Sequence, residues 1–244
     1  MKSSVALIRF ILTFGLLALR VEAEVSRVSF CDSLHNREFS AAIYEPLTVE
    51  QPARFAIISA GYGVPDTSYS FLADALCQTG ILVVCIQHHL PSDPPLAQSG
   101  DLRTLRLPAW QSGVRNLEFV IAELKRTRPS LVSKWPILIG HSNGGDISCL
   151  FAATHPTQIA CLITLDHRRM PLPRIPGLRC LSIRAAEFDA DHDVLPTPEQ
   201  PDAERITIVH LPGAKHMDLT DQGPVSTRET VVGLVTNFVA RPMP

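Results

Sequence analysis

The segment 140–144 reads Gly-His-Ser-Asn-Gly and joins two stretches of different periodicity. Residues 136–139 form a short apolar run typical of a buried strand, and residues 146–153 follow the pattern of a helix. A serine at such a strand-to-helix turn must hold strained backbone angles, and the flanking glycines keep larger side chains away from neighbouring strands. The turn therefore lifts the hydroxyl of Ser142 clear of the sheet and makes it a candidate nucleophile. The alternative is a glycine-rich turn whose serine has no chemical role.

The first 23 residues have the three parts of a secretory signal peptide. Lys2 and Arg9 give a positive start, residues 10–19 are apolar, and residues 21–23 end in alanine at the expected cleavage position. An apolar run of about ten residues is too short for a bilayer, which needs ~20. We expect a mature chain that starts near Glu24 and is secreted or periplasmic. An uncleaved N-terminal anchor is the alternative.

The composition excludes several classes of protein. With 22 Lys and Arg against 24 Asp and Glu, the chain has no basic surface for nucleic acid. Residues 24–244 suffice for a single α/β domain, and no repeat or linker divides them. No Cys-x-x-Cys spacing occurs, so we expect no metal and no cofactor. The expected partner is a small molecule.

The six cysteines leave the redox chemistry open. An even number in an oxidising compartment permits up to three disulfides, of which we allow one or two without assigned pairs. Cys85, Cys161 and Cys180, however, lie within apolar strand-like runs, where cysteine often packs as a small hydrophobic residue.

The periodicity predicts alternating strands and helices, and therefore a parallel sheet with helices on both faces. The first two predicted strands alternate in polarity and suit an antiparallel edge, whereas most later ones are almost continuously apolar. Predicted strands are 25–31, 39–44, 55–59, 81–87, 136–140, 161–165, 180–184 and 206–211. Predicted helices are 68–77, 110–126, 143–153 and 227–239. In such a sheet the functional residues lie at the carboxyl ends of the strands.

A nucleophilic serine needs a base, an acid that orients the base, and donors for the oxyanion. Two histidines belong to the last strand region. His210 lies within the predicted strand 206–211 and is expected to be structural or exposed at the sheet edge. His216 follows that strand in the loop 212–217, from which an imidazole can reach Ser142. We expect His216 to be the general base, the alternative being a solvated loop histidine.

Three segments are spaced as in α/β-hydrolases: Ala-Gly-Tyr-Gly at 60–63, Gly-His-Ser-Asn-Gly-Gly at 140–145 and Gly-Ala-Lys-His at 213–216. The chain resembles this superfamily from about residue 39 to residue 239. More narrowly, it is similar to the branch of platelet-activating-factor acetylhydrolase-like and dienelactone-hydrolase-like esterases. The resemblance implies an α/β-hydrolase fold, with about eight strands in a mostly parallel sheet and no sizeable cap domain. One departure is Ala60 where the family usually has His, a side chain that helps to fix the loop.

The resemblance places the acid in the loop after strand 180–184, between the nucleophile and the base in chain order. This loop holds four carboxylates in seven residues. Asp191 fits best, because Val194 and Pro196 follow it much as in the family, with one residue added before the proline. Asp189 and Glu187 remain alternatives.

The resemblance also indicates which backbone groups bind the oxyanion. One donor is the N–H of Asn143, directly after the nucleophile, and the other is the N–H of Tyr62 in the loop after the third strand. Gly61 and Gly63 let this backbone approach the substrate carbonyl.

The surroundings of the serine describe the substrate only coarsely. Residues 166–178 leave no room for a cap between two strands, which indicates an open cleft for small or flexible acyl compounds. Residues 90–109, rich in proline and leucine, are expected to form one wall. His88 and His89 with Asp93 have poor metal-ligand spacing and fit a polar wall better.

A second polar segment follows strand 161–165. Its basic side chains either face an anionic substrate or form a solvated loop, and both readings stay open. They belong to His167, Arg168, Arg169 and Arg174.

Together these features predict a secreted serine hydrolase that cleaves carboxylic esters through an acyl-enzyme intermediate with Ser142, Asp191 and His216. Amidases, thioesterases and acyltransferases use the same intermediate and remain alternatives. A catalytically weak scaffold used for binding is a further alternative, suggested by Ala60 and by the crowded acid loop.

Overall fold

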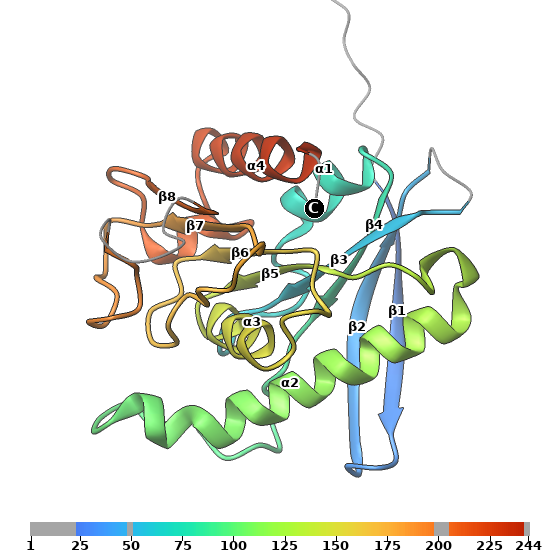
Figure 1. Cartoon of the computed structure of the whole chain (residues 1–244), viewed down its shortest axis with the longest axis horizontal. Helices are drawn as coiled ribbons and strands as arrows, with labels where there is room; N and C mark the ends of the chain where they lie inside the picture. The colour runs from blue at the N-terminus through green and yellow to red at the C-terminus, as the bar shows by residue number, and fades with distance from the viewer. Residues whose placement is uncertain (1–22, 48–50, 198–204, 242–244) are drawn as a thin grey trace, which may run out of the picture.

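The computed structural model describes residues 23–47, 51–197 and 205–241 (Figure 1). Residues 1–22, which include nearly all of the expected signal peptide, lie outside them. The strands are β1 (Glu24–Asp32), β2 (Arg37–Glu45), β3 (Arg54–Ser59), β4 (Ile81–Ile86), β5 (Ile137–His141), β6 (Cys161–Leu165), β7 (Cys180–Arg184) and β8 (Ile206–His210). The helices are α1 (Ser70–Cys77), α2 (Leu102–Thr127), α3 (Asn143–Thr154) and α4 (Val225–Ala240). Every predicted strand and helix is present, and most ends differ from the prediction by two residues or fewer.

The eight strands form one sheet in the order β1-β2-β4-β3-β5-β6-β7-β8. β1 pairs antiparallel with β2, and β2 pairs antiparallel with β4. From β4 to β8 all neighbours are parallel, so their carboxyl ends share one edge of the sheet. The predicted antiparallel edge and the mostly parallel sheet are both confirmed.

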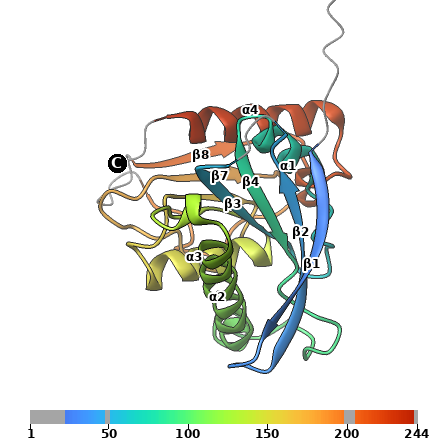
Figure 2. The ribbon, with the colours of Figure 1, turned by 90° about the vertical axis from the view of Figure 1, so that its right-hand side faces the viewer.

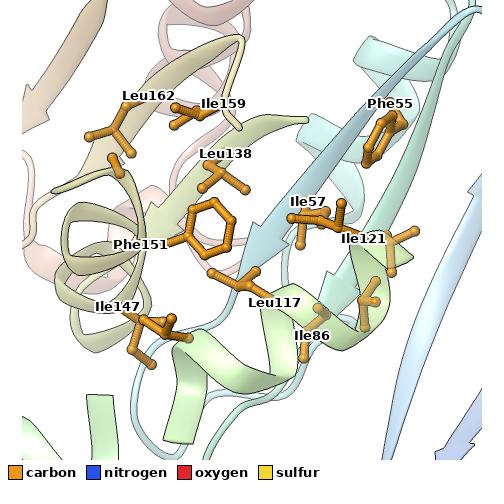
Figure 3. Packing of buried hydrophobic residues seen from close by; sticks show 14 of the residues in the cluster. Phe55, Ile57, Ile86, Leu117, Ile121, Leu138, Ile147, Phe151, Ile159 and Leu162 are labelled. Carbon is orange, nitrogen blue, oxygen red and sulfur yellow. The ribbon is translucent and has the colours of Figure 1, made fainter. Parts of the chain in front are cut away.

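Helices cover both faces of the sheet, as Figures 1 and 2 show. α1 and α4 lie on one face, and α2 and α3 lie on the other. Side chains of the central strands alternate between two cores, one on each face. On the α2 and α3 face, Leu117 and Phe151 pack onto Ile57 and Leu138 (Figure 3). Burial of this apolar area, at roughly 25 cal/mol per Å², stabilises the layered arrangement.

Helix α2 begins earlier than predicted. The sequence pattern placed its start at Trp110, but the helix begins at Leu102 and contains Pro108, although proline usually disfavours a helix interior. Asp101 is its N-cap, and the side chain accepts a hydrogen bond from the Thr104 N–H at 3.3 Å. The two added turns bring the first part of α2 beside the carboxyl edge of the sheet.

No cap domain lies between β6 and β7. The connection from β6 to β7, residues 166–179, is described throughout and contains no helix or strand. No helix in the described part of the chain is both long enough and apolar enough to cross a membrane.

None of the disulfides that the sequence allowed is present. All six cysteines fall among the described residues and all are free. Five of them are buried, and burial raises the pKa of Cys161 and Cys180 to about 12. These thiols therefore pack as small hydrophobic side chains, as their position in apolar strands indicated.

Candidate active site

Ser142 occupies a strained turn between β5 and α3. Its φ of 52° and ψ of −121° lie outside the regions that ordinary residues adopt. A Cβ atom at Gly140 would lie 2.3 Å from the Gly144 carbonyl oxygen, and one at Gly144 would lie 2.1 Å from the Ser59 carbonyl oxygen. Only glycine fits at both positions. The Ser142 N–H donates to the Leu165 carbonyl at 2.9 Å, which ties the turn to the end of β6.

His216 follows β8 and begins a short 3₁₀ helix, η3 (His216–Leu219). The Nδ1 atom of His216 lies 2.6 Å from Oδ2 of Asp166, which directly follows β6. The imidazole ring lies 4.7 Å from the ring of His141, the neighbour of Ser142, measured between centroids. The structure thus brings together the loops after β5, β6 and β8 at the carboxyl edge.

Asp166 is completely buried and is held by three groups. Oδ2 contacts His216, while Oδ1 accepts the Ala185 N–H at 3.1 Å and lies 3.2 Å from the Arg184 guanidinium. Burial alone would raise the pKa of this carboxyl, but the His216 hydrogen bond and the charge of Arg184 outweigh it and hold the pKa below the ordinary 3.8. Asp166 is therefore an ionised partner for the imidazole.

The prediction that Asp191 pairs with His216 is wrong. Asp191 is exposed and pairs with Arg169 at 3.2 Å. Asp189 is exposed as well, and no contact joins it to His216 among the described residues. Glu187 does reach His216, but its Oε2 accepts the backbone N–H at 2.8 Å and does not contact the ring. The loop after β7 offers no carboxylate to the imidazole ring, because Glu187 reaches only the backbone of His216 and Asp191 is paired with Arg169.

The sequence analysis missed Asp166 although one signal was present. Asp166 is the first residue after the apolar strand 161–165, the strand next to the one that precedes Ser142 in the sheet. A carboxylate at the carboxyl end of a buried strand is a candidate for a site in a parallel sheet. Its φ of 50° is a left-handed conformation that aspartate tolerates better than most residues.

A buried hydrogen-bond chain links the loop after β3 to the loop after β8. The Gly61 N–H donates to the Tyr69 hydroxyl at 3.0 Å, which lies 2.9 Å from His141 Nδ1. His141 Nε2 lies 3.1 Å from the His216 carbonyl oxygen. A carbonyl only accepts, so Nε2 carries the proton of His141. Burial, the nearby His216 adding to it, lowers the pKa of His141 to about 3, so Nδ1 is unprotonated and accepts from Tyr69.

This hydrogen-bond chain takes the loop-fixing role that the resemblance would assign to a histidine at position 60. The Tyr69 hydroxyl fixes the loop 60–63 by taking the Gly61 N–H, which leaves the Tyr62 N–H as the next backbone donor along the loop. A Cβ at Gly61 would lie 3.4 Å from Ser142 Cβ, so this loop lies directly against the serine. Asn143 is the first residue of α3, where backbone N–H groups have no acceptor within the helix. The predicted donors, Tyr62 and Asn143, therefore belong to segments that border Ser142.

A pocket of about 310 Å³ opens beside Asn143. The segment 90–109 supplies much of its wall, as predicted, together with His88 and His89. Among the described residues, no group of three or more His, Cys, Asp or Glu side chains is arranged to hold a metal ion. His88 is buried, which lowers its pKa to about 3, and its Nε2 lies 2.9 Å from the Ser59 hydroxyl.

The basic side chains of residues 167–174, which follow β6, lie in different surroundings. Arg168 lies 4.4 Å above the ring of Phe188, which in turn packs edge-on against His216 at 5.7 Å. Arg169 pairs with Asp191, and Arg174 is exposed. His167 is buried. Only Arg168 thus lies close to the predicted base, while His210, also considered as a base, is exposed at the end of β8.

Comparisons with known proteins agree with the architecture. No protein-family model matches the chain, and no curated protein matches its sequence. A dienelactone hydrolase from Anabaena variabilis is 17% identical with a TM-score of 0.66 over 92% of this chain and 100% of that one. An α/β serine hydrolase without a lid from Xanthomonas campestris is 19% identical, with a TM-score of 0.55 over 88% and 95%. An esterase from Pyrococcus furiosus is 13% identical, with a TM-score of 0.62 over 91% and 92%.

Identities this low show the fold alone. The chain has the α/β-hydrolase fold, and the predicted fold class is confirmed.

Proposed function

We propose that this protein is a serine hydrolase that cleaves carboxylic esters with Ser142 as nucleophile, His216 as general base and Asp166 as the acid. The observation that carries the proposal is the 2.6 Å contact between His216 Nδ1 and the buried Asp166, at the edge where the strained Ser142 turn lies. The order Ser142, Asp166, His216 along the chain is that of α/β-hydrolases. The esterases and dienelactone hydrolase that share the fold agree with this chemistry.

In the proposed reaction, His216 takes the proton of Ser142 as the hydroxyl attacks the ester carbonyl carbon. Asp166 accepts the Nδ1–H of the imidazole, so Nε2 is the atom left to receive the proton. The ionised carboxylate then stabilises the imidazolium that forms. His216 returns the proton to the leaving alcohol, and water hydrolyses the acyl-enzyme by the same steps in a second half-reaction.

The oxyanion is stabilised by the N–H groups of Tyr62 and Asn143. Such donors lower the barrier because they are already oriented when charge develops on the carbonyl oxygen. The Tyr69 and His141 chain holds the loop 60–63 in place, which supports this role despite Ala60.

A fluorophosphonate probe followed by the Ser142→Ala variant tests the proposal. We expect the probe to label Ser142, located by peptide mass spectrometry, and the variant to lose about 10⁴-fold or more of its p-nitrophenyl acetate hydrolysis. A Ser148→Ala variant is a matched control, because this buried serine bonds only the Gly144 carbonyl of its own helix. Ester hydrolysis within tenfold of wild type in Ser142→Ala would contradict the assignment and favour a binding scaffold.

We further propose that the protein is secreted after cleavage near Glu24. The expected cleavage position lies directly before β1, which starts at Glu24, so removal of the preceding residues would leave the sheet whole. Mass spectrometry of the protein from its native host should show a mature N-terminus near Glu24. An intact N-terminus on the exported protein would indicate the anchor instead.

A further inference from the structure

The pocket beside Asn143 lies along the carboxyl edge of the sheet. Asn143 and Ile147 of α3 lie at one end, next to the nucleophile turn after β5. His89, which follows β4, forms part of the wall, and its ring lies 4.7 Å from that of Tyr62. Arg37, the first residue of β2, lies at the other end. The pocket therefore runs along the carboxyl edge from β5 past β3 and β4 to β2.

His216, which would protonate a leaving alcohol, lies on the opposite side of Ser142 together with Asp166 and Phe188. Asp166 follows β6, Phe188 follows β7 and His216 follows β8. His216 must reach the leaving-group oxygen to return its proton, so the alcohol lies toward β6 to β8. The acyl group is bonded to the other side of the same carbonyl carbon. It must therefore extend toward β4 and β2, into the pocket.

The lining of the pocket is more apolar than polar. Ile147, which shares α3 with Asn143, contributes hydrocarbon surface, as do Leu96 and Ala109. From β5 to β2 there are three interstrand spacings, about 14 Å in all. The volume of about 310 Å³ corresponds to roughly ten non-hydrogen atoms at ~30 Å³ each, the share of a water molecule. A long and narrow space of this size suits one unbranched chain.

An ion pair closes the far end. Arg37 donates to both carboxylate oxygens of Asp93, at 2.8 and 2.7 Å, and the two side chains are only partly buried. Asp93 also accepts the Leu90 N–H at 2.8 Å, which fixes the loop after β4. Hydrocarbon pressed against this pair would take water from both charges without replacing its hydrogen bonds. The pair therefore sets a limit on chain length.

We propose that this pocket binds the acyl chain of the substrate, and that the protein acts on esters of unbranched, medium-length fatty acids. This inference rests on the proposed function. Acyl groups of roughly eight to ten carbons fill the space, shorter ones leave it partly empty, and longer ones reach the Arg37–Asp93 pair.

The first test uses p-nitrophenyl esters from acetate to dodecanoate with the full chain. We expect kcat/KM to rise at least tenfold from acetate to octanoate or decanoate, and to fall again at dodecanoate. A rate that falls steadily from acetate onward would overturn the proposal while leaving the serine hydrolase intact.

The second test fills the pocket. Ala109 is half-buried on α2 and lines the space, so Ala109→Leu should lower the ratio of octanoate to acetate kcat/KM at least tenfold. Ala122→Leu on the same helix is the matched control, because Ala122 is exposed and does not line the pocket. Its ratio should equal that of wild type. An unchanged ratio in Ala109→Leu would overturn the proposal.

A binding measurement separates this proposal from the proposed function. Octanamide should bind wild type but not Ala109→Leu, by saturation-transfer NMR, whether or not any ester is cleaved. Binding of this kind without ester hydrolysis would refute the hydrolase and keep the pocket as a site for acyl chains. Ester hydrolysis with equal octanamide binding by both proteins would refute the pocket and keep the hydrolase.

Discussion

The end of β6 and the loop after β7 both offer carboxylates to the same imidazole, and they differ in burial. Asp166 is 0% exposed and contacts the His216 ring, whereas the Asp191 side chain is 44% exposed and pairs with Arg169. The loop after β7 is richer in carboxylates, but its Glu187 reaches only the His216 backbone. A single buried carboxylate at a strand end is thus better placed to orient a base than four on a solvated loop.

The reason lies in the cost of burying a charge. An ionised carboxylate leaves water only where hydrogen bonds and an opposite charge replace the solvent. Asp166 obtains these from His216, the Ala185 N–H and Arg184. Once it is held in this way, its direction is fixed and no water competes for its oxygens. An exposed carboxylate keeps its rotational freedom and its water, so it orients a partner weakly.

The largest expected effect concerns the acid itself. Asp166→Asn should lower kcat/KM for p-nitrophenyl esters by about 10⁴-fold, because an amide no longer selects the tautomer that leaves Nε2 free. The assay is steady-state kinetics with the fold checked by circular dichroism. Asp191→Asn and Asp189→Asn serve as controls and should stay within about threefold of wild type, since neither side chain contacts the His216 ring. A reversal of these results would restore the acid to the loop after β7.

Arg184, the partner of Asp166, and Arg169, the partner of Asp191, should contribute differently to the stability of the fold. Arg184→Met removes the cation beside buried Asp166 and should lower the free energy of unfolding by about 3–5 kcal/mol. Arg169→Met breaks the exposed pair with Asp191 and should cost about 1 kcal/mol or less. Urea unfolding of both variants at pH 7 measures the difference. Equal losses would mean that burial does not distinguish the two pairs.

Sequence patterns predicted the fold and two of the three proposed catalytic residues. Apolar strands and helical spacing are local properties, so the order of elements could be derived, and the Ser142 turn depends on glycines close to it in sequence. Asp166 could not be found in this way, because its role depends on Arg184 and His216, which lie 18 and 50 positions further along the chain. The prediction also missed the start of α2, where the Asp101 cap and the helical residues around Pro108 outweigh the effect of the proline.

Asp146 of α3 is a second buried carboxylate, and its pKa is raised whereas that of Asp166 is lowered. Oδ1 of Asp146 accepts the N–H groups of Arg169 and Met170, both at 2.9 Å, but no cation as close as Arg184 compensates its burial. Burial raises its pKa from 3.8 to about 6. The folded state therefore holds this proton more tightly than the unfolded state, and the stability contributed by the neutral acid is lost as pH rises from about 4 to about 6.

Asp146→Asn should remove the loss of stability that wild type shows as the pH rises from about 4 to about 6. Relative to the variant, wild type should lose up to about 3 kcal/mol of unfolding free energy between pH 4 and pH 7, at about 1.4 kcal/mol per pKa unit. Asp166, with its lowered pKa, contributes stability above pH 3.8 that disappears as the pH falls further. Urea unfolding of wild type, Asp146→Asn and Asp166→Asn from below pH 3.8 up to pH 7 separates the two slopes. A wild-type difference from Asp146→Asn that is constant with pH would contradict the raised pKa.

The smallest expected effect is at Glu187, the one carboxylate among residues 187–193 that contacts His216. Its carboxylate accepts the His216 N–H at 2.8 Å, and an exposed hydrogen bond of this kind contributes about 1 kcal/mol or less. Glu187→Ala should lower kcat by about two- to fivefold through a less ordered loop. Glu187→Gln keeps an oxygen that can accept the same N–H, so its kcat should match wild type. If Glu187→Gln instead lost activity as severely as Asp166→Asn, the charge of the loop would matter, and the contrast between the buried and the exposed carboxylates would fail.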